Sequence, residues 1–187
     1  KKQTGGAGQY AKIVINMDPN ERGKGYEFVD DIFGGAIDQQ FRPAVDKGVR
    51  DQMKKGVIAG CMVVDVKVTL TDGKTHPVDS KDIAFQVAGR GAFKEAFMKA
   101  KPVLLEPIVH VEVTVPSGNV GDITGDLASR RGRPQGQESL PGGMAVIKAV
   151  VPLAELADYN SRLSSITGGQ GSYAMEFSHY EAVPGNL

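Results

Sequence analysis

Two stretches of this chain decide the fold of its second half: IVHVEVTVP at residues 108–116 and MAVIKAVVP at residues 144–152. Both are rich in β-branched residues and end in proline, as expected of a strand that stops at a corner. A constant offset of 36 positions relates several pairs of residues: Pro116 to Pro152, Asp122 to Asp158, Leu127 to Leu163, Ser129 to Ser165 and Gly132 to Gly168. The second half therefore contains an internal repeat.

Each repeat unit is predicted to be a strand, a corner proline and a helix that ends at a glycine. Apolar residues at Val120, Ile123 and Leu127 have helical spacing, and we expect Gly132 and Gly168 to adopt the left-handed conformation that ends helices. A strand before Gly142 and a last strand, SYAMEFSHY at residues 172–180, complete the order β-α-β-β-α-β. That order predicts a ferredoxin-like sandwich.

The first half alternates strand and helix signals. Alternating residues at 10–17 and 26–33 predict two strands in a hairpin-like arrangement, and residues 63–70 predict a third strand that ends in the turn Thr71-Asp72-Gly73. The fold class is therefore α+β, with a break near the prolines of residues 101–107. We expect domains at residues 1–103 and 104–187.

Two helices are predicted in this half. The first starts at Pro43, has apolar residues at four-residue spacing and stops at Gly56. The second starts near Ser80 and is stopped by Pro102. Its apolar side is predicted to contain Ile83, Val87, Ala88, Ala92, Ala96 and Ala100.

The composition limits the possible partners. The 22 Lys and Arg residues balance 22 Asp and Glu residues, so no global field attracts nucleic acid and any RNA contact must be local. Apolar runs are far shorter than a bilayer span and no signal segment opens the chain, which predicts a cytoplasmic protein without a membrane partner. Cys61 is expected to be a buried, inert thiol. Because Lys1 opens the chain without an initiator Met, we expect a piece of a longer protein.

No arrangement of residues favours catalysis or metal binding. His76, Asp79 and Ser80 fall within one five-residue loop, whereas a catalytic triad needs its base oriented from a separate rigid element. His110 and His179 are interpreted as strand side chains, and the three histidines lack metal-ligand spacing. The glycines at 5, 6 and 8 lack the Gly-Lys-Ser/Thr ending of a phosphate loop. We therefore predict no catalytic residue, metal or cofactor in this chain.

Two other features suit binding. The glycine turn at residues 5–8 lets a backbone approach a ligand closely, and it is flanked by cations and amides suited to RNA: Lys1, Lys2, Gln3, Gln9 and Lys12. A tight structural turn is the alternative. The second feature contains Arg130, Arg131 and Arg133, where contact with phosphate or an acidic partner competes with a simple helix-dipole role.

Motifs along the whole chain resemble bacterial elongation factor G. In the first half they are QTGGAGQY (3–10), GYEF (25–28), PAVDKG (43–48), TDG (71–73) and VDS (78–80) with His76. In the second half they are PVLLEP (102–107), GD (121–122), GDL (125–127), RRG (130–132), VPLAE (151–155) and YAMEF (173–177).

The resemblance implies the family's fourth and fifth domains. The fourth would have the fold of the second domain of ribosomal protein S5, with its N-terminal strand truncated, and the fifth the ferredoxin-like sandwich. The parent would be a monomeric GTPase whose GTP and Mg²⁺ bind in an N-terminal domain outside this chain. Its partner would be the ribosome during movement of tRNA and mRNA.

The resemblance also implies where each domain binds. The tip of the fourth domain would contact the tRNA–mRNA duplex in the small-subunit decoding region through two loops: Gly5, Gly6, Ala7, Gly8 and Gln9, and His76, Pro77, Val78, Asp79 and Ser80. His76 and Gln9 would be its hydrogen-bonding points. The fifth domain would lie on large-subunit RNA near the GTPase-associated centre, with Arg130, Arg131 and Arg133 as the contact expected there.

Three departures from the family pattern indicate a divergent member, with a paralogue as one alternative. Ala7 stands where the family commonly has Arg, Pro77 replaces an acid, and Lys81 replaces a second Ser. A recycling-specialised factor and a ribosomal protection protein remain alternatives, although GGxGQY and HxVDS disfavour the latter. The non-ribosomal alternative is a small-molecule regulatory module built on the ferredoxin-like half.

Overall fold

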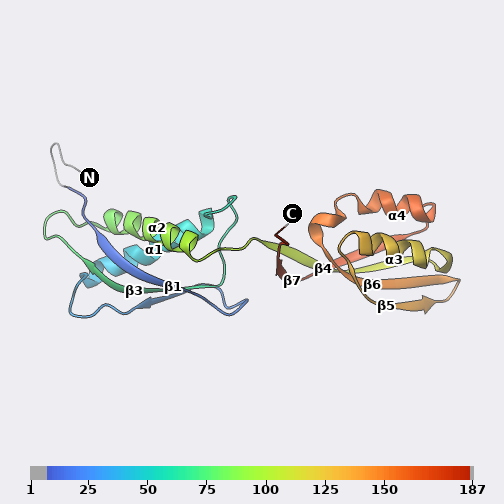
Figure 1. Cartoon of the computed structure of the whole chain (residues 1–187), viewed down its shortest axis with the longest axis horizontal. Coiled ribbons are helices and arrows are strands. Elements are labelled where there is room, and N and C mark those ends of the chain that lie inside the picture. The colour runs from blue at the N-terminus through green and yellow to red at the C-terminus, as the bar shows by residue number, and fades with distance from the viewer. Residues whose placement is uncertain (1–7, 186–187) are drawn as a thin grey trace. The chain divides into compact units, whose positions relative to one another are not determined.

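The computed structural model describes residues 8–185, which form two compact units that divide between Pro102 and Val103. Each unit has its own β-sheet with two α-helices packed on one face (Figure 1). The predicted α+β class is confirmed. Within residues 8–185 no helix is both long enough and apolar enough to span a membrane.

The first unit contains a three-stranded sheet in the order β1-β3-β2. Its elements are β1 (Lys12–Pro19), β2 (Glu27–Asp30), a 3-10 turn η1 (Gln39–Phe41), α1 (Arg42–Lys55), β3 (Val66–Lys74) and α2 (Asp82–Lys99). β1 runs antiparallel to β3 and β2 runs parallel to it. The predicted hairpin is therefore wrong. β3 takes the centre because Val66, Val68 and Leu70 are all buried, whereas the edge strands are less covered.

The predicted turn at residues 71–73 is also wrong, because β3 continues to Lys74. β1 has a bulge between Val14 and Ile15, and the residues of β1 that precede this bulge pair with Asp72, Gly73 and Lys74. Gly73 is required here by close packing: a Cβ atom at this position would collide with the Lys12 carbonyl oxygen and the Ile37 side chain. Gly73 therefore marks a position of close packing within the sheet, and it does not mark the chain reversal that was predicted.

Helix α1 agrees with its prediction, with Pro43 in its first turn and buried Val45, Val49 and Met53. Helix α2 has the predicted length, but its predicted apolar face is partly wrong. Ile83 and Val87 are 46% and 52% exposed, whereas the buried side contains Ala84, Phe85, Gly89 and Phe93. The two phenylalanine rings offer more apolar area to bury than the aliphatic side chains, so they determine which side faces the sheet.

Two glycines let α1 and α2 cross closely. A Cβ atom on Gly48 would collide with the Gln86 carbonyl, and one on Gly89 would lie 2.6 Å from the Val45 carbonyl oxygen. Gly48→Ala is therefore expected to lower the free energy of unfolding by about 1–3 kcal/mol, because the helices must separate. The matched control is Gly91→Ala, at an exposed position of α2 where an added Cβ atom would have no neighbour within 4 Å. That change is expected to stabilise by about 0.5–1 kcal/mol. Urea unfolding of both variants checks the crossing, and equal shifts would contradict it.

The second unit is a four-stranded antiparallel sheet in the order β5-β6-β4-β7. Its elements are β4 (Leu105–Pro116), η2 (Ser117–Asn119), α3 (Val120–Ser129), β5 (Arg133–Leu140), β6 (Met144–Pro152), η3 (Leu153–Leu156), α4 (Tyr159–Thr167) and β7 (Ser172–Ala182). This order and pairing confirm the predicted ferredoxin-like sandwich. Its core combines inward strand residues with Ile123, Leu127, Tyr159 and Leu163 of the helices.

The repeat is visible in the structure, with one difference. Pro116 and Pro152 each end a strand, and Gly168 closes α4 with a left-handed φ of 59°. At the end of α3, however, Arg131 takes the left-handed conformation, with φ 58°, and Gly132 does not. Gly132 is needed instead because a Cβ atom would lie 2.5 Å from the Leu127 carbonyl oxygen.

The prediction of a buried Cys61 is wrong, because this thiol is exposed. The apolar stretch around it forms a loop between α1 and β3 rather than a strand, and only Val63 within it is buried. A loop presents its side chains on several sides, so apolar composition alone did not indicate burial.

Candidate functional site

Two segments distant in sequence meet at one end of the first unit. The Gly8 amide donates to Asp79 Oδ1 at 2.9 Å, and the Tyr10 amide donates to the Asp79 carbonyl at 2.9 Å. In return, Ser80 Oγ donates to the Tyr10 carbonyl at 2.9 Å. Gly5, Gly6 and Ala7 lie outside the described residues, so these bonds concern only the described end of the first loop.

The second loop, residues 76–80, is held by its own side chains. Ser80 Oγ accepts the His76 amide at 2.8 Å, so Ser80 ties this loop to itself and to the Tyr10 segment. Helix α2 begins just after it, with Lys81 rather than Ser80 at the capping position. Pro77 and Val78 are exposed, and Val78 is 70% exposed. The loop therefore presents an apolar side chain on a rigid turn.

His76 has a defined tautomer in this arrangement. Its Nδ1 atom lies 3.5 Å from Asp79 Oδ2 but accepts the closer amides of Val78 at 3.3 Å and Asp79 at 3.2 Å, and these two bonds assign the hydrogen of the neutral ring to Nε2. The side chain is 48% exposed, and the Tyr10 ring lies 6.0 Å away, centroid to centroid. His76 can thus offer an N–H donor while its other nitrogen maintains the loop.

Gly8 cannot be replaced without disturbing this tip. A Cβ atom there would lie 2.9 Å from Cγ and Oδ1 of Asp79. Gln9, the next residue, is exposed. Both residues were predicted from the sequence to lie at the tip, and the structure places Gly8 directly against the second loop.

Two residues that were not predicted from the sequence lie beside the tip. Tyr10 contributes its backbone and its ring, as described above. Lys74 is directly opposite Lys12 in the β1–β3 register, and both are exposed. Like charges directly opposite each other destabilise a sheet, so this pair favours an anionic ligand. Only the extension of β3 beyond the expected turn reveals the pair, although its lysines are visible in the sequence.

The three arginines that were predicted as a contact, Arg130, Arg131 and Arg133, all have internal partners. Arg130 binds Asp126 at 2.8 Å and Asp158 at 2.6 Å, and its side chain is only 13% exposed. Arg131 makes two parallel hydrogen bonds to Glu106, of 2.7 and 2.9 Å, and a third to Glu155. These bonds raise the pKa of both guanidinium groups and lower that of Glu106.

Arg133 differs from the other two arginines. It binds Glu181 at 2.5 Å but remains 57% exposed. Its guanidinium and the neighbouring His179 both lower the pKa of Glu181 through hydrogen bonds. Of the three, Arg133 therefore has the most surface available to a ligand.

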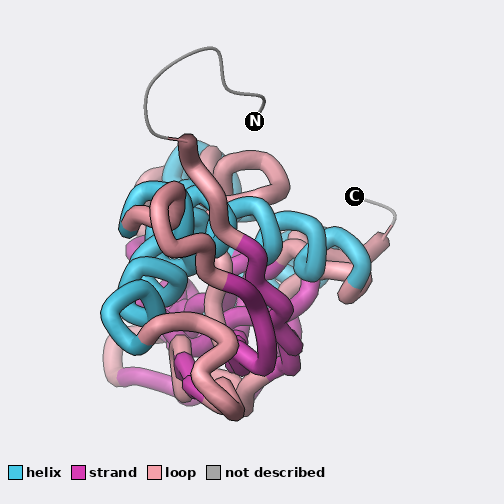
Figure 2. Tube along the Cα trace, turned by 90° about the vertical axis from the view of Figure 1, so that its left-hand side faces the viewer, coloured by secondary structure: helices cyan, strands magenta, loops and turns pink. Residues whose placement is uncertain are grey.

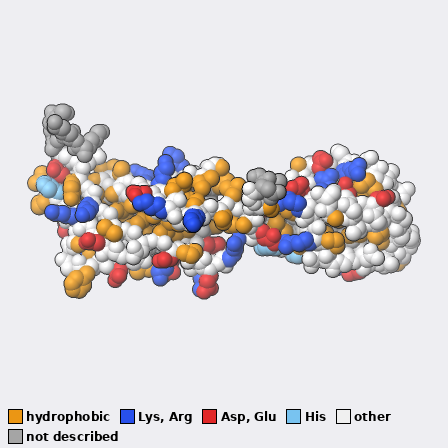
Figure 3. All heavy atoms as spheres, in the orientation of Figure 1, with side chains coloured by type: hydrophobic (Ala, Val, Ile, Leu, Met, Phe, Trp, Pro, Cys, Tyr) orange, Lys and Arg blue, Asp and Glu red, His pale blue; other side chains and the backbone are white. Residues whose placement is uncertain are grey.

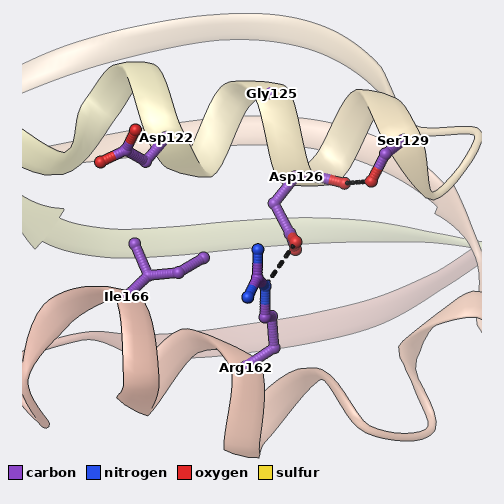
Figure 4. Close-up of a pocket in the computed structure, with 6 residues that line it drawn as sticks. All are labelled: Asp122, Gly125, Asp126, Ser129, Arg162 and Ile166. Atoms are coloured by element: carbon purple, nitrogen blue, oxygen red, sulfur yellow. Dashed lines mark hydrogen bonds and ion pairs between the residues drawn. The ribbon is translucent and has the colours of Figure 1, made fainter.

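A groove of about 410 Å³ lies between α3 and α4 (Figure 4). Asp122, Asp126 and Ser129 line it from α3, and Arg162 and Ile166 line it from α4. Arg162 and Arg130 both bind the Asp126 carboxylate, so its charge is already compensated. Among residues 8–185 no group of three or more His, Cys, Asp and Glu side chains could hold a metal ion.

The fold and the tip define a class of protein: two α+β units in sequence, the first of which presents two hydrogen-bonded loops at one end. The family model of elongation factor G domain IV matches residues 1–101, and the model of the elongation factor G C-terminus matches residues 103–187. The chain belongs to the elongation factor G family.

Individual relatives agree with this assignment. The chain is 57% identical over its full length to an elongation factor G-like protein of Thermotoga maritima and 55% identical to elongation factor G of Aquifex pyrophilus. A crystal structure of a protein from Thermus thermophilus covers 99% of the chain with a TM-score of 0.85 and 44% identity. The chain spans about a quarter of the length of each of these proteins, 26–27%.

Proposed function

We propose that this chain is the ribosome-engaging part of a translational GTPase that promotes movement of tRNA and mRNA. The observation that carries the proposal is the hydrogen-bonded tip, because it holds an exposed N–H donor beside two lysines on a rigid support. The tip would contact the tRNA–mRNA duplex in the decoding region of the small subunit. Its contacting residues would be Gly5, Gly6, Ala7, Gly8, Gln9, His76, Pro77, Val78, Asp79 and Ser80.

The geometry supports a mechanical role for the tip. The Asp79 carboxylate and the Ser80 hydroxyl are used within the tip, so its shape is fixed before it meets RNA. The His76 Nε2–H donor and the opposed pair Lys12 and Lys74 would then bind phosphate or ribose oxygens. A tip of fixed shape that occupies space beside the tRNA–mRNA duplex would oppose backward slippage of the tRNA and mRNA, and this role needs no bond-breaking chemistry.

The rest of the proposal concerns the parent protein. Residues 1–103 would form the tip domain, and residues 104–187 would lie on large-subunit RNA near the GTPase-associated centre. GTP and Mg²⁺ would bind in an N-terminal domain outside this chain, and the monomeric protein would act in the cytoplasm. On the face shown in Figure 3, acidic and basic side chains of the described residues intermingle, which agrees with local rather than global attraction to RNA.

The test is a direct measurement with the full-length protein. Ribosomes with a tRNA in the acceptor position are mixed with protein and GTP, and the position of the mRNA is read by primer extension. We expect the mRNA to advance by one codon only with GTP. Separation of the ribosomal subunits without prior movement would contradict translocation and favour the recycling alternative.

Of the three arginines, Arg133 is the residue that we expect to contact large-subunit RNA. Arg133→Ala in the full-length protein should weaken ribosome binding and reduce the slope of log affinity against log salt by about one unit for each phosphate that the variant no longer binds. Lys148→Ala is the control, since it removes a less exposed cation of the same sheet (40%, against 57% for Arg133) that pairs with Glu138 and Glu112. Equal slopes for Arg133→Ala and the wild type would remove this residue from the proposed contact.

A further inference from the structure

The loop between β2 and α1, residues 31–38, presents one large apolar side chain to solvent. Phe33 is 93% exposed, more than any other large hydrophobic residue among residues 8–185. Gly34 and Gly35 follow it with φ of 64° and 73°, so the chain turns sharply under the ring. Single exposed apolar residues are common on protein surfaces, so it is the display of this ring on a sharp turn, and not its exposure alone, that singles Phe33 out.

The loop is held in one shape rather than loosely attached. Arg42 donates to the Ile37 carbonyl through Nε at 3.1 Å and Nη2 at 3.0 Å, and its Nη1 atom binds Asp30 at 3.0 Å. One guanidinium thus joins the two ends of the loop. Ile37 is fully buried, and the Asp31 amide donates to the Leu70 carbonyl. Phe33 is therefore displayed from a preorganised support, which reduces the entropic cost of binding.

This loop lies at the same end of the first unit as the tip. β2 runs parallel to β3, with Asp30 opposite Leu70, so both strands point toward that end. Thr75 donates to Asp38 at 3.4 Å, and the Ile37 side chain lies against Gly73. The loops that leave β2 and β3 turn at the same end in Figure 1, and Figure 2 looks onto that end. A partner bound at the tip would therefore lie close to Phe33.

The charges around Phe33 select the class of partner. Residues 30–41 contain Asp30, Asp31 and Asp38 and no Lys or Arg, and Arg42 is engaged in closing the loop. Asp31 and Asp38 are exposed. The exposed carboxylates of this loop repel RNA phosphates, whereas they complement a protein surface rich in lysine and arginine. An aromatic anchor within complementary charge is the usual centre of a protein–protein contact.

We propose that Phe33 inserts into an apolar pocket on a basic protein of the ribosome, with Asp31 and Asp38 binding the cations around that pocket. This inference rests on the proposed function, because it is the tip's engagement with the ribosome that brings such a protein within reach. It adds a protein contact beside the RNA contacts of the tip.

Variants of the full-length protein test the anchor through ribosome affinity. Phe33→Ala is expected to lower the affinity roughly five- to thirtyfold, as removal of an anchor residue does. Phe33→Leu should retain most of the affinity, because a pocket accepts an aliphatic side chain. Val87→Ala, which truncates an exposed apolar residue of α2 in the same unit, is the matched control and should bind like the wild type. An equal loss for Leu and Ala would indicate stacking on a base and overturn the protein partner.

A photocrosslinking amino acid at position 33 identifies the partner directly. Crosslinked ribosomes are digested with ribonuclease or with protease, and the label is expected to stay on a basic ribosomal protein that resists ribonuclease. A label on RNA, or none, overturns the inference. Failure of the wild-type protein to bind ribosomes would instead contradict the proposed function, whereas normal binding of both the wild type and Phe33→Ala would contradict only the anchor.

Discussion

Full-length protein with His76→Ala is expected to move tRNA and mRNA about ten- to a hundredfold more slowly than the wild type, while ribosome-stimulated GTP hydrolysis stays nearly unchanged. The physical reason is the loss of an N–H donor to a charged or ribose oxygen, a bond worth about 1.5–3 kcal/mol when one partner is charged. Rapid-mixing measurements of mRNA movement and of phosphate release, made on the same preparation, check both expectations.

A second variant separates contact from support. In His76→Asn the side-chain oxygen can still accept the amides of Val78 and Asp79, as Nδ1 does now, whereas the Nδ2–H donors of this shorter side chain do not reach the position of Nε2–H. If His76 binds RNA directly, Asn slows movement nearly as much as Ala. Full recovery with Asn would mean that His76 only maintains the loop. His110→Ala, at an exposed position of β4, is the control and should move mRNA at the wild-type rate.

Arg131→Ala is expected to give the largest loss of stability, about 2–3 kcal/mol in the free energy of unfolding of the second unit. The change leaves the Glu106 carboxylate, whose side chain is only 11% exposed, without its two charged hydrogen bonds. Urea unfolding of the chain, followed by probes in the second unit, measures the effect. Arg133→Ala removes a more exposed ion pair and should cost less than about 1 kcal/mol.

The same pair should give stability a dependence on acid pH. Hydrogen bonding to Arg131 lowers the pKa of Glu106 below its ordinary value of 4.5. The folded state therefore holds this group ionised more strongly than the unfolded state does, so the contribution is present above pH 4.5 and is lost as the pH falls through the folded value. In Arg131→Ala, the free energy of unfolding should depend less on pH in this acid range. A steep, unchanged acid dependence in the variant would show that other carboxylates cause it.

The second unit was predictable because its signals are local and repeated. Pro116 and Pro152 mark the two strand ends, and the apolar residues after each of them have helical spacing, so strand, corner and helix could be placed without knowing what they pack against. Which residue ended the first helix of the repeat could not be predicted. Arg131 adopts the left-handed conformation, and its side chain is held by Glu106 and Glu155, which are distant in sequence.

The errors in the first unit have a common origin. The pairing of β1 and β2 with β3, the continuation of β3 through Gly73 and the burial of Phe85 rather than Val87 all depend on which element lies at the centre. Local pattern shows that a segment is a strand or a helix, but the neighbour that it pairs with is selected by burial of the whole sheet. Cys61 was assigned to the core for the same reason, from composition without a packing partner.

By itself the sequence determined the α+β class, the β-α-β-β-α-β order, the likeness to elongation factor G and the residue types of the two tip loops. Only the tertiary structure decided that Asp79 and Ser80 join those loops, that Lys74 lies opposite Lys12, that the arginines of the second unit are engaged internally and that Phe33 is exposed beside the tip. The reason is physical. Periodicity and turn chemistry act between residues a few positions apart, whereas these contacts join segments distant in sequence and exist only once both sheets have packed.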